Sequence, residues 1–101
     1  MSFARINIDQ AKTLIRDRQA NVVDIRDRAS FDAGHIENAI HLDNETVSEF
    51  VSTADHSTPL VVCCYHGNMS QGAANYFGEQ GFAEAYSLDG GYALWQQQGG
   101  G

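Results

Sequence analysis

The chain has 101 residues, of which 43% are hydrophobic and 19% charged. This composition is typical of one folded domain, expected over residues 1–101, and argues against intrinsic disorder. The formal net charge at pH 7 is −7. A surface of that sign repels nucleic acid and anionic lipid, so neither is expected as a partner.

The charges are distributed unevenly along the chain. All six Lys and Arg residues lie between Arg5 and Arg28, and the chain from Ala29 onward carries nine acidic residues and no Lys or Arg. The simplest interpretation is that the acidic part keeps the protein in solution. A second interpretation is an acidic face that docks on a basic patch of another protein.

No apolar run approaches the ~20 residues that a membrane-spanning helix needs, and the N-terminus lacks a signal-peptide pattern. The two cysteines, Cys63 and Cys64, are neighbours, and adjacent cysteines rarely form a structural disulfide because the geometry is strained. Free thiols are typical of a cytoplasmic protein, which is the location we expect. The sequence gives no signal for an oligomer, so a monomer is expected.

The first part of the chain predicts a strand, a helix and a second strand. A weak strand is expected at 3–6. The helix that follows has a capping box, in which Asn7 is the N-cap and Gln10 is the third helical residue. Apolar residues then recur at helical spacing. The strand expected at 22–25 (VVDI) has an acidic residue near its end.

A short helix, a short strand and another helix are expected next. The helix over 29–33 is expected to stop at Gly34. A short strand is predicted over 39–42. Asn44 is then predicted to cap a helix that continues through 47–51.

The most apolar strand of the chain is predicted over 60–63, central in its sheet and buried on both faces. A helix over 70–80, a strand over 85–88 and a final helix around 92–95 follow, and 98–101 are expected to form a frayed tail. Strands that alternate with helices predict a three-layer α/β/α domain, with a mainly parallel central sheet of about five strands.

The predicted central strand runs directly into Cys64, which is followed by a short loop and a helix that starts near Ser70. In open α/β sheets, ligands bind beyond the carboxyl ends of the strands, so Cys64 lies where a functional site is expected. Cys63, inside the apolar strand, is interpreted as a small buried hydrophobic residue.

The backbone N–H groups from Tyr65 to Ser70 would form an anion-binding nest if the loop curled around the sulfur atom of Cys64. Gly67 supplies the backbone freedom that such a curl needs, and the hydroxyl group of Ser70 could donate one more hydrogen bond. Together with the helix N-terminus, these donors should lower the pKa of Cys64 below the ~8.5 of a free cysteine.

Four segments of the chain resemble the rhodanese family of sulfurtransferases. They are 24–26 (DIR), 31–41 (FDAGHIENAIH), the loop 64–68 (CYHGN) and 88–92 (LDGGY). They cover nearly the whole chain in the order found in the family. The loop is most similar to that of the bacterial single-domain thiosulfate sulfurtransferases of the glycerol 3-phosphate regulon.

This resemblance implies a ping-pong reaction through a persulfide on the catalytic residue Cys64. Thiosulfate would donate the sulfur, and cyanide or a thiol such as dihydrolipoate or reduced thioredoxin would accept it. No metal or organic cofactor is implied. The loop that would bind the substrate and the persulfide consists of Tyr65, His66, Gly67, Asn68, Met69 and Ser70.

The sequence departs from the family pattern in three ways. Glu37 and Asn38 replace the usual Pro-Gly, Met69 replaces a small hydroxyl residue, and the loop lacks the Arg or Lys that many members carry there. Thiosulfate would then meet mainly dipoles, with His66 as the only loop side chain that protonation could make positive, so a high KM for thiosulfate is predicted.

Other polar residues are interpreted as structural. Asp24 and Arg26 are expected to form an ion pair, although Arg26 could support the site if its side chain turned toward it. His35 and His41 are expected to anchor the loop between the second and third strands, and His56 is expected at the surface. The spacing of the cysteines disfavours a metal site.

Three alternative functions remain open from the sequence. The first is a cysteine phosphatase or arsenate reductase, which needs an Arg six positions after the cysteine, where this chain has Ser70. The second is a persulfide relay or an acidic docking module without thiosulfate turnover. The third is redox sensing through a strained disulfide between Cys63 and Cys64.

Overall fold

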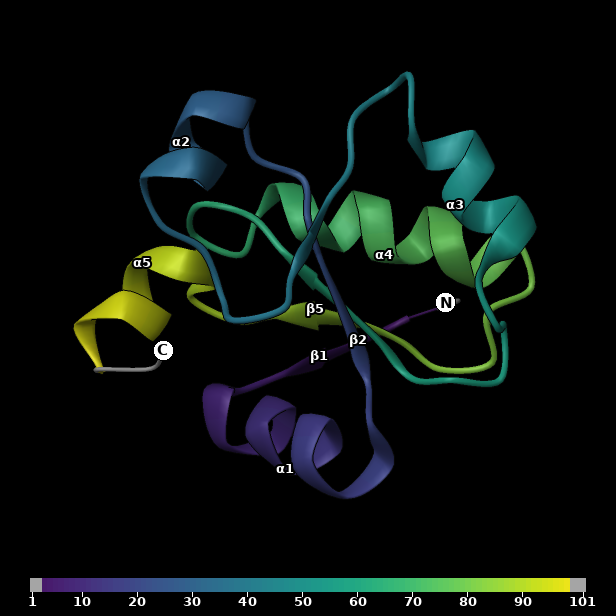
Figure 1. The fold of residues 1–101 in the computed structure, drawn as a ribbon. Coiled ribbons are helices and arrows are strands. Elements are labelled where there is room, and N and C mark those ends of the chain that lie inside the picture. The colour runs from purple at the N-terminus through teal and green to yellow at the C-terminus, as the bar shows by residue number, and fades with distance from the viewer. Residues whose placement is uncertain (1–2, 99–101) are drawn as a thin grey trace.

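A five-stranded sheet forms the centre of the computed structural model, which describes residues 3–98 (Figure 1). The order of the strands is β1-β5-β4-β2-β3, and every neighbouring pair is parallel. The predicted α/β architecture with about five strands is therefore confirmed, and the sheet is parallel throughout. The strands are β1 (Ala4–Ile6), β2 (Asn21–Asp24), β3 (Ile40–His41), β4 (Leu60–Cys63) and β5 (Ala85–Leu88).

Helices cover both faces of the sheet. The helices are α1 (Ile8–Arg18), α2 (Arg28–Ala33), α3 (Val47–Thr53), α4 (Met69–Glu79) and α5 (Gly91–Gln97). Side chains of α1 and α5 belong to one apolar cluster, and side chains of α3 and α4 belong to a second. Figure 1 shows α1 on one side of the sheet and α3 and α4 on the other. No helix among residues 3–98 is long and apolar enough to cross a membrane.

Strand β4 is the central strand, as predicted, and all four of its residues are buried. Val61 and Cys63 face the cluster of α1 and α5, whereas Leu60 and Val62 face the cluster of α3 and α4. Both faces are therefore packed, which is typical of a parallel sheet covered by helices. The packing fixes the backbone at the carboxyl end of β4, where Cys64 follows.

The predicted capping box at the start of α1 is present. The backbone N–H of Gln10 donates to the Asn7 side chain over 2.8 Å, and the backbone N–H of Asn7 donates to the Gln10 side chain over the same distance. Two of the N–H groups at the start of the helix thus find partners locally.

The predicted N-cap of α3 is wrong. Helix α3 starts at Val47, its N-cap is Thr46, and no side chain caps it. The turn before it is held by the carboxylate of Asp43, which accepts the backbone N–H groups of Glu45 and Thr46 over 2.9 and 3.0 Å. This carboxylate binds two consecutive N–H groups and delays the helix start beyond Asn44.

His56 is partly exposed, in line with the expected surface position, and its ring also packs on neighbouring residues. Its ring is half-buried and stacks on Phe82 with 4.1 Å between ring centroids, and its Nε2 lies 2.6 Å from the carbonyl oxygen of Val51. The imidazole therefore packs at the edge of the apolar cluster of α3 and α4, to which Phe82 belongs. Of the tail expected at 98–101, Gln98 donates its N–H to the carbonyl of Leu94, and the rest lies outside the described residues.

Candidate active site

The sulfur atom of Cys64 lies inside the loop that joins β4 to α4. It is 3.2 Å from the backbone nitrogen of Gly67 and 3.3 Å from both the backbone nitrogen and the Oγ of Ser70. Cys64 exposes 1% of its surface, so the loop controls access to it. We call the loop from Cys64 to Ser70 the cradle. The geometry agrees with the anion-binding nest expected from the sequence.

The environment of Cys64 favours the thiolate. Burial raises the pKa of its thiol, but hydrogen bonds from Ser70, Gly67 and His66 outweigh burial and leave the pKa below its ordinary value. Burial together with the nearby carboxylate of Asp24 raises the pKa of Cys63 to about 12. The pKa values of the two adjacent cysteines are therefore shifted in opposite directions, and Cys64 is the better candidate for a nucleophile.

The first turn of α5 holds the back of the cradle. The N–H of Tyr92 donates to the carbonyl of Cys64 over 2.9 Å, and the N–H of Ala93 donates to the carbonyl of Tyr65 over 3.1 Å. In a trans peptide, the N–H points opposite to the carbonyl. Holding the Tyr65 carbonyl toward α5 therefore turns the N–H of His66 toward the sulfur atom.

Two glycines let the cradle and α5 approach each other this closely. Gly67 has φ +91°, and a Cβ atom there would lie 2.9 Å from the backbone nitrogen of Gly90. Gly91 has φ +59°, and its Cβ would lie 2.5 Å from the carbonyl oxygen of Cys64. Both positions thus require glycine for conformation and for space. The sequence predicted this role for Gly67, and did not predict it for Gly91.

A second hydroxyl group stands behind Ser70. The Oγ of Ser87, a fully buried residue of β5, lies 2.7 Å from the Oγ of Ser70. When the sulfur is a thiolate, Ser70 donates to it and accepts the proton of Ser87, so each hydroxyl finds a partner. Ser87 was not among the site residues predicted from the sequence. Its signal was a small hydroxyl residue between Tyr86 and Leu88 in a short strand.

The side chain of Tyr65 points away from the sulfur and ties the cradle to α2. Its phenol donates to the carboxylate of Asp27, and the backbone N–H of Asp27 lies 3.3 Å from the phenol oxygen. Asp27 is also the N-cap of α2, where it accepts the N–H of Ser30. The bonds from Tyr65 and Ser30 hold the pKa of the Asp27 carboxyl well below its usual range. Asp27 was not among the site residues predicted from the sequence.

Asp24 and Arg26 form the ion pair expected from the sequence. Both are buried, and the Arg26 guanidinium contacts the carboxylate through Nε at 3.0 Å and Nη2 at 2.8 Å. The same guanidinium donates to the carbonyl of Gly34 and lies over the ring of Tyr92, 4.4 Å from its centroid. Arg26 thereby links β2 to Gly34 and to Tyr92 of α5. Its hydrogen bonds go to Asp24 and Gly34, and none goes to Cys64.

The two histidines near α2 act as anchors, as expected. His35 Nδ1 lies 2.7 Å from the carbonyl oxygen of Phe31, and the two rings stack with 3.8 Å between centroids. His41 Nε2 lies 2.7 Å from the carbonyl oxygen of Arg26. Both contacts fix the chain between β2 and β3.

The outer surface of the cradle is formed by His66, Asn68 and Met69, which are all exposed. Met69 exposes 58% of its surface and so adds an apolar side chain to the outside of the cradle. Donors to the sulfur thus come from the backbone and Ser70, while these side chains face outward.

The model of the rhodanese-like domain family matches residues 7–98. The chain belongs to the rhodanese family. The resemblance seen in four sequence segments is therefore confirmed. The cradle lies between two of these segments, 31–41 and 88–92.

The comparisons cover nearly the whole chain. A thiosulfate sulfurtransferase GlpE from Pseudomonas aeruginosa (strain LESB58) is 55% identical over 95 residues, which are 94% of this chain and 86% of the relative. The solution structure of the rhodanese-like domain from the Anabaena sp. Alr3790 protein has a TM-score of 0.83 at 25% identity, and the match covers 95% of this chain and 75% of that one.

A third rhodanese-like fold belongs to a protein of unknown function from Rhodopseudomonas palustris, described as a possible tyrosine phosphatase. It has a TM-score of 0.81 at 21% identity and covers 99% of this chain and 84% of that one. At this identity the similarity shows the fold alone.

Proposed function

We propose that this rhodanese is a thiosulfate sulfurtransferase that works through a persulfide on Cys64. The observation that carries the proposal is the ring of donors around a cysteine whose pKa is lowered. The 55% identity to a thiosulfate sulfurtransferase from P. aeruginosa supports the choice of substrate. The whole chain, 1–101, acts as one rhodanese domain.

In the first half-reaction, the Cys64 thiolate attacks the outer sulfur of thiosulfate. A new sulfur–sulfur bond forms, the bond within thiosulfate breaks, and sulfite leaves with the electron pair. The product is a Cys64 persulfide, whose terminal sulfur carries the negative charge. The N–H groups of Gly67 and Ser70, together with the hydroxyl of Ser70, stabilise negative charge in the cradle.

In the second half-reaction, a nucleophile attacks the terminal sulfur of the persulfide. Cyanide leaves as thiocyanate, and the Cys64 thiolate is restored with its electron pair. Small dithiols and thioredoxin are further acceptors that we propose, because a thiolate attacks the same sulfur atom. No metal or organic cofactor takes part in either step.

We further propose that the protein is a cytoplasmic monomer. Both cysteines are free, and a nucleophilic thiolate needs a compartment in which thiols stay reduced.

A mass measurement tests the reaction directly. The protein is incubated with thiosulfate, desalted, and its intact mass is recorded. We expect a gain of one sulfur atom, which cyanide then removes with the release of one equivalent of thiocyanate. Cys63→Ser should behave in the same way as the unchanged chain, because Cys63 faces away from the cradle.

Cys64→Ser is the matched negative control and should gain no sulfur. The absence of a mass gain in the unchanged protein would contradict thiosulfate turnover. Sulfur gained instead from the persulfide of a cysteine desulfurase would favour the second candidate, a persulfide relay. The same cradle supports a relay, since it would stabilise a persulfide whatever its source.

The site does not support the phosphatase or arsenate reductase hypothesis. Those enzymes need an Arg six residues after the cysteine to clamp an oxyanion, and here that residue is Ser70, whose Oγ contacts the sulfur. A disulfide switch is disfavoured as well, because a thiol with a pKa of about 12 at Cys63 ionises too rarely to attack a disulfide or sulfenic acid.

A further inference from the structure

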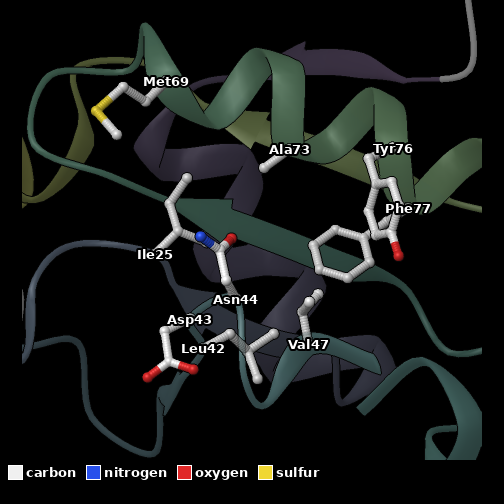
Figure 2. Close-up of a pocket in the computed structure, with 9 residues that line it drawn as sticks. All are labelled: Ile25, Leu42, Asp43, Asn44, Val47, Met69, Ala73, Tyr76 and Phe77. Carbon is white, nitrogen blue, oxygen red and sulfur yellow. The ribbon is translucent and has the colours of Figure 1, made fainter. Parts of the chain in front are cut away.

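We propose that an apolar groove between α3 and α4, beside the cradle, docks a segment of a protein sulfur acceptor. This segment would carry apolar side chains next to its cysteine, with Lys or Arg residues flanking them. The inference rests on the proposed function and names the class of acceptor. The groove has a volume of about 440 Å³, and the residues used in the argument below are Ile25, Asp43, Val47, Met69, Tyr76 and Phe77 (Figure 2).

The groove begins at the rim of the cradle. Met69 lines one end of it, and the next residue, Ser70, donates its backbone N–H to the sulfur of Cys64. Ile25 lines the groove as well, and its N–H binds the carbonyl of Cys63 over 3.0 Å. A segment in the groove would therefore have its cysteine close to the persulfide.

The lining of the groove is unusually apolar for exposed surface. Three large hydrophobic side chains are exposed among residues 3–98, and two of them, Met69 (58%) and Tyr76 (39%), line this groove. Val47 and Phe77 line it as well. Figure 2 shows Met69 at one end and Tyr76 and Phe77 at the other. Exposed apolar surface gathered in one concave place marks a contact for a partner.

The charges around the groove select a basic partner. Asp43 lines the groove, and Glu45 follows two residues later in the same turn, where its N–H binds the Asp43 carboxylate. From Ala29 onward the chain has no Lys or Arg, so no cation of α3 or α4 neutralises these acids. An apolar segment with flanking Lys or Arg residues complements both the lining and the charge.

The transfer itself balances as an exchange between sulfur atoms. The acceptor thiolate attacks the terminal sulfur of the Cys64 persulfide, a new sulfur–sulfur bond forms on the acceptor, and the Cys64 thiolate leaves with the electron pair. Docking contributes proximity, because the groove holds the acceptor cysteine beside the persulfide.

Three synthetic peptides of equal length, each with one cysteine, test the groove. The first places Leu beside the cysteine and Lys at both ends, the second replaces Lys with Glu, and the third replaces Leu with Ser. Each peptide is mixed with protein that was loaded with thiosulfate and desalted, and peptide persulfide is followed by mass spectrometry. We expect the first peptide to react about tenfold faster than the others, and to slow as salt is added.

Matched variants separate the groove from the chemistry. Tyr76→Ser and Glu45→Lys should slow transfer to the first peptide and leave transfer to cyanide unchanged. Ile40→Ser and Glu37→Lys are the controls, since Ile40 is as exposed (40%) as Tyr76 and neither lines the groove. These controls should leave both reactions unchanged.

A binding measurement keeps this inference distinct from the proposed function. The first peptide, with Ser in place of its cysteine and a fluorescent label, is titrated with unloaded protein and followed by anisotropy. Binding that Tyr76→Ser and Glu45→Lys weaken supports the groove even if thiosulfate loads no sulfur. No binding, or equal transfer rates for the three peptides from loaded protein, would overturn it.

Discussion

The pKa values of two neighbouring cysteines in this chain shift in opposite directions, because successive residues at the end of a strand face different surroundings. Cys63 is packed in the apolar cluster of α1 and α5, with the carboxylate of Asp24 nearby. Cys64 meets backbone N–H groups and a hydroxyl. Side-chain direction and the curl of the loop, rather than residue type, thus decide which sulfur reacts.

Alkylation should distinguish the two thiols. With iodoacetamide at pH 7, we expect modification of Cys64 alone, at a rate that rises with pH and levels off below the ordinary pKa of a cysteine. Cys63 should resist until the pH approaches its pKa of about 12 or the protein unfolds. Peptide mapping by mass spectrometry gives the modified site. Modification of Cys63 in the folded protein at pH 7 would contradict the assignment.

Ser70→Ala should raise the pKa of Cys64, because one hydrogen bond to the thiolate is lost while burial remains. The pH profile of persulfide formation should move to higher pH. At pH 7 the rate should fall about tenfold, as expected for the loss of a hydrogen bond to a charged group worth ~1.5 kcal/mol. Ser87→Ala is the control, with a smaller shift, since Ser87 reaches the sulfur through Ser70. An unchanged profile in Ser70→Ala would exclude this role.

At the scale of elements, the cradle and the N-terminus of α5 form one unit. The first N–H groups of a helix lack partners within the helix, and here those of Tyr92 and Ala93 bind carbonyls of the cradle. These hydrogen bonds satisfy N–H groups in the first turn of α5, and they fix the orientation of the peptide groups that follow Cys64 and Tyr65. Gly91 allows the contact, since a side chain there would collide with the carbonyl of Cys64.

Gly91→Ala should therefore damage the site more than an ordinary glycine substitution. The added methyl group must displace the carbonyl of Cys64 and occupies a backbone conformation that Ala disfavours. We expect persulfide formation to fall at least about tenfold, together with a lower midpoint in denaturant. Gly72→Ala is the control, because nothing lies within 4 Å of its added Cβ and its φ is not in the left-handed region. Equal activity in the two variants would contradict the prediction.

The ion pair behind the cradle should matter for stability. Arg26→Leu leaves the carboxylate of Asp24 buried without its partner, which costs ~3–5 kcal/mol of unfolding free energy. The matched control is Arg16→Leu, which breaks an exposed pair with Asp17 and should change stability by less than ~1 kcal/mol. Urea unfolding followed by circular dichroism measures both. A small effect of Arg26→Leu would show that water or another cation compensates Asp24.

The features that the sequence predicted well are local in the chain. The central strand, the loop around Cys64 and the capping box at Asn7 depend on residues a few positions apart. The features it missed depend on distant segments. Ser87 and Asp27 reach the cradle from β5 and from the start of α2, and their own neighbours gave no sign of this. The wrong N-cap at Asn44 had a local cause. Asp43 and Asn44 are adjacent and either side chain could accept the N–H groups of the turn, and in the structure Asp43 does so.

At the scale of the whole molecule, the net charge of −7 opposes the approach of an anionic donor. Thiosulfate carries two negative charges, and the cradle supplies backbone dipoles and hydroxyl groups without a Lys or Arg. Dipoles act over a few ångströms, whereas the net charge acts over a Debye length, ~10 Å at 0.1 M salt. An approaching thiosulfate ion is therefore repelled by the net charge of the protein before it comes close enough for the N–H groups of the cradle to stabilise it.

Added salt should consequently lower the KM for thiosulfate, because ions screen the repulsion before the donor reaches the cradle. We expect a decrease of a few-fold between low and near-physiological ionic strength, with kcat nearly unchanged. Steady-state kinetics with cyanide as acceptor, at fixed pH, measure this. A KM that rises with salt would show instead that the added anion occupies the cradle.

The dependence of the cradle on α5 has a consequence for protein synthesis. Cys64 and its loop leave the ribosome before Gly91, but the donors that hold the loop carbonyls come from α5. The edge strand β1 also waits for β5 before it can pair. A nascent or prematurely terminated chain thus carries the thiol without its fixed cradle. The loop around the thiol can therefore be held in place only after β5 and α5 have been made and have packed against the rest of the domain.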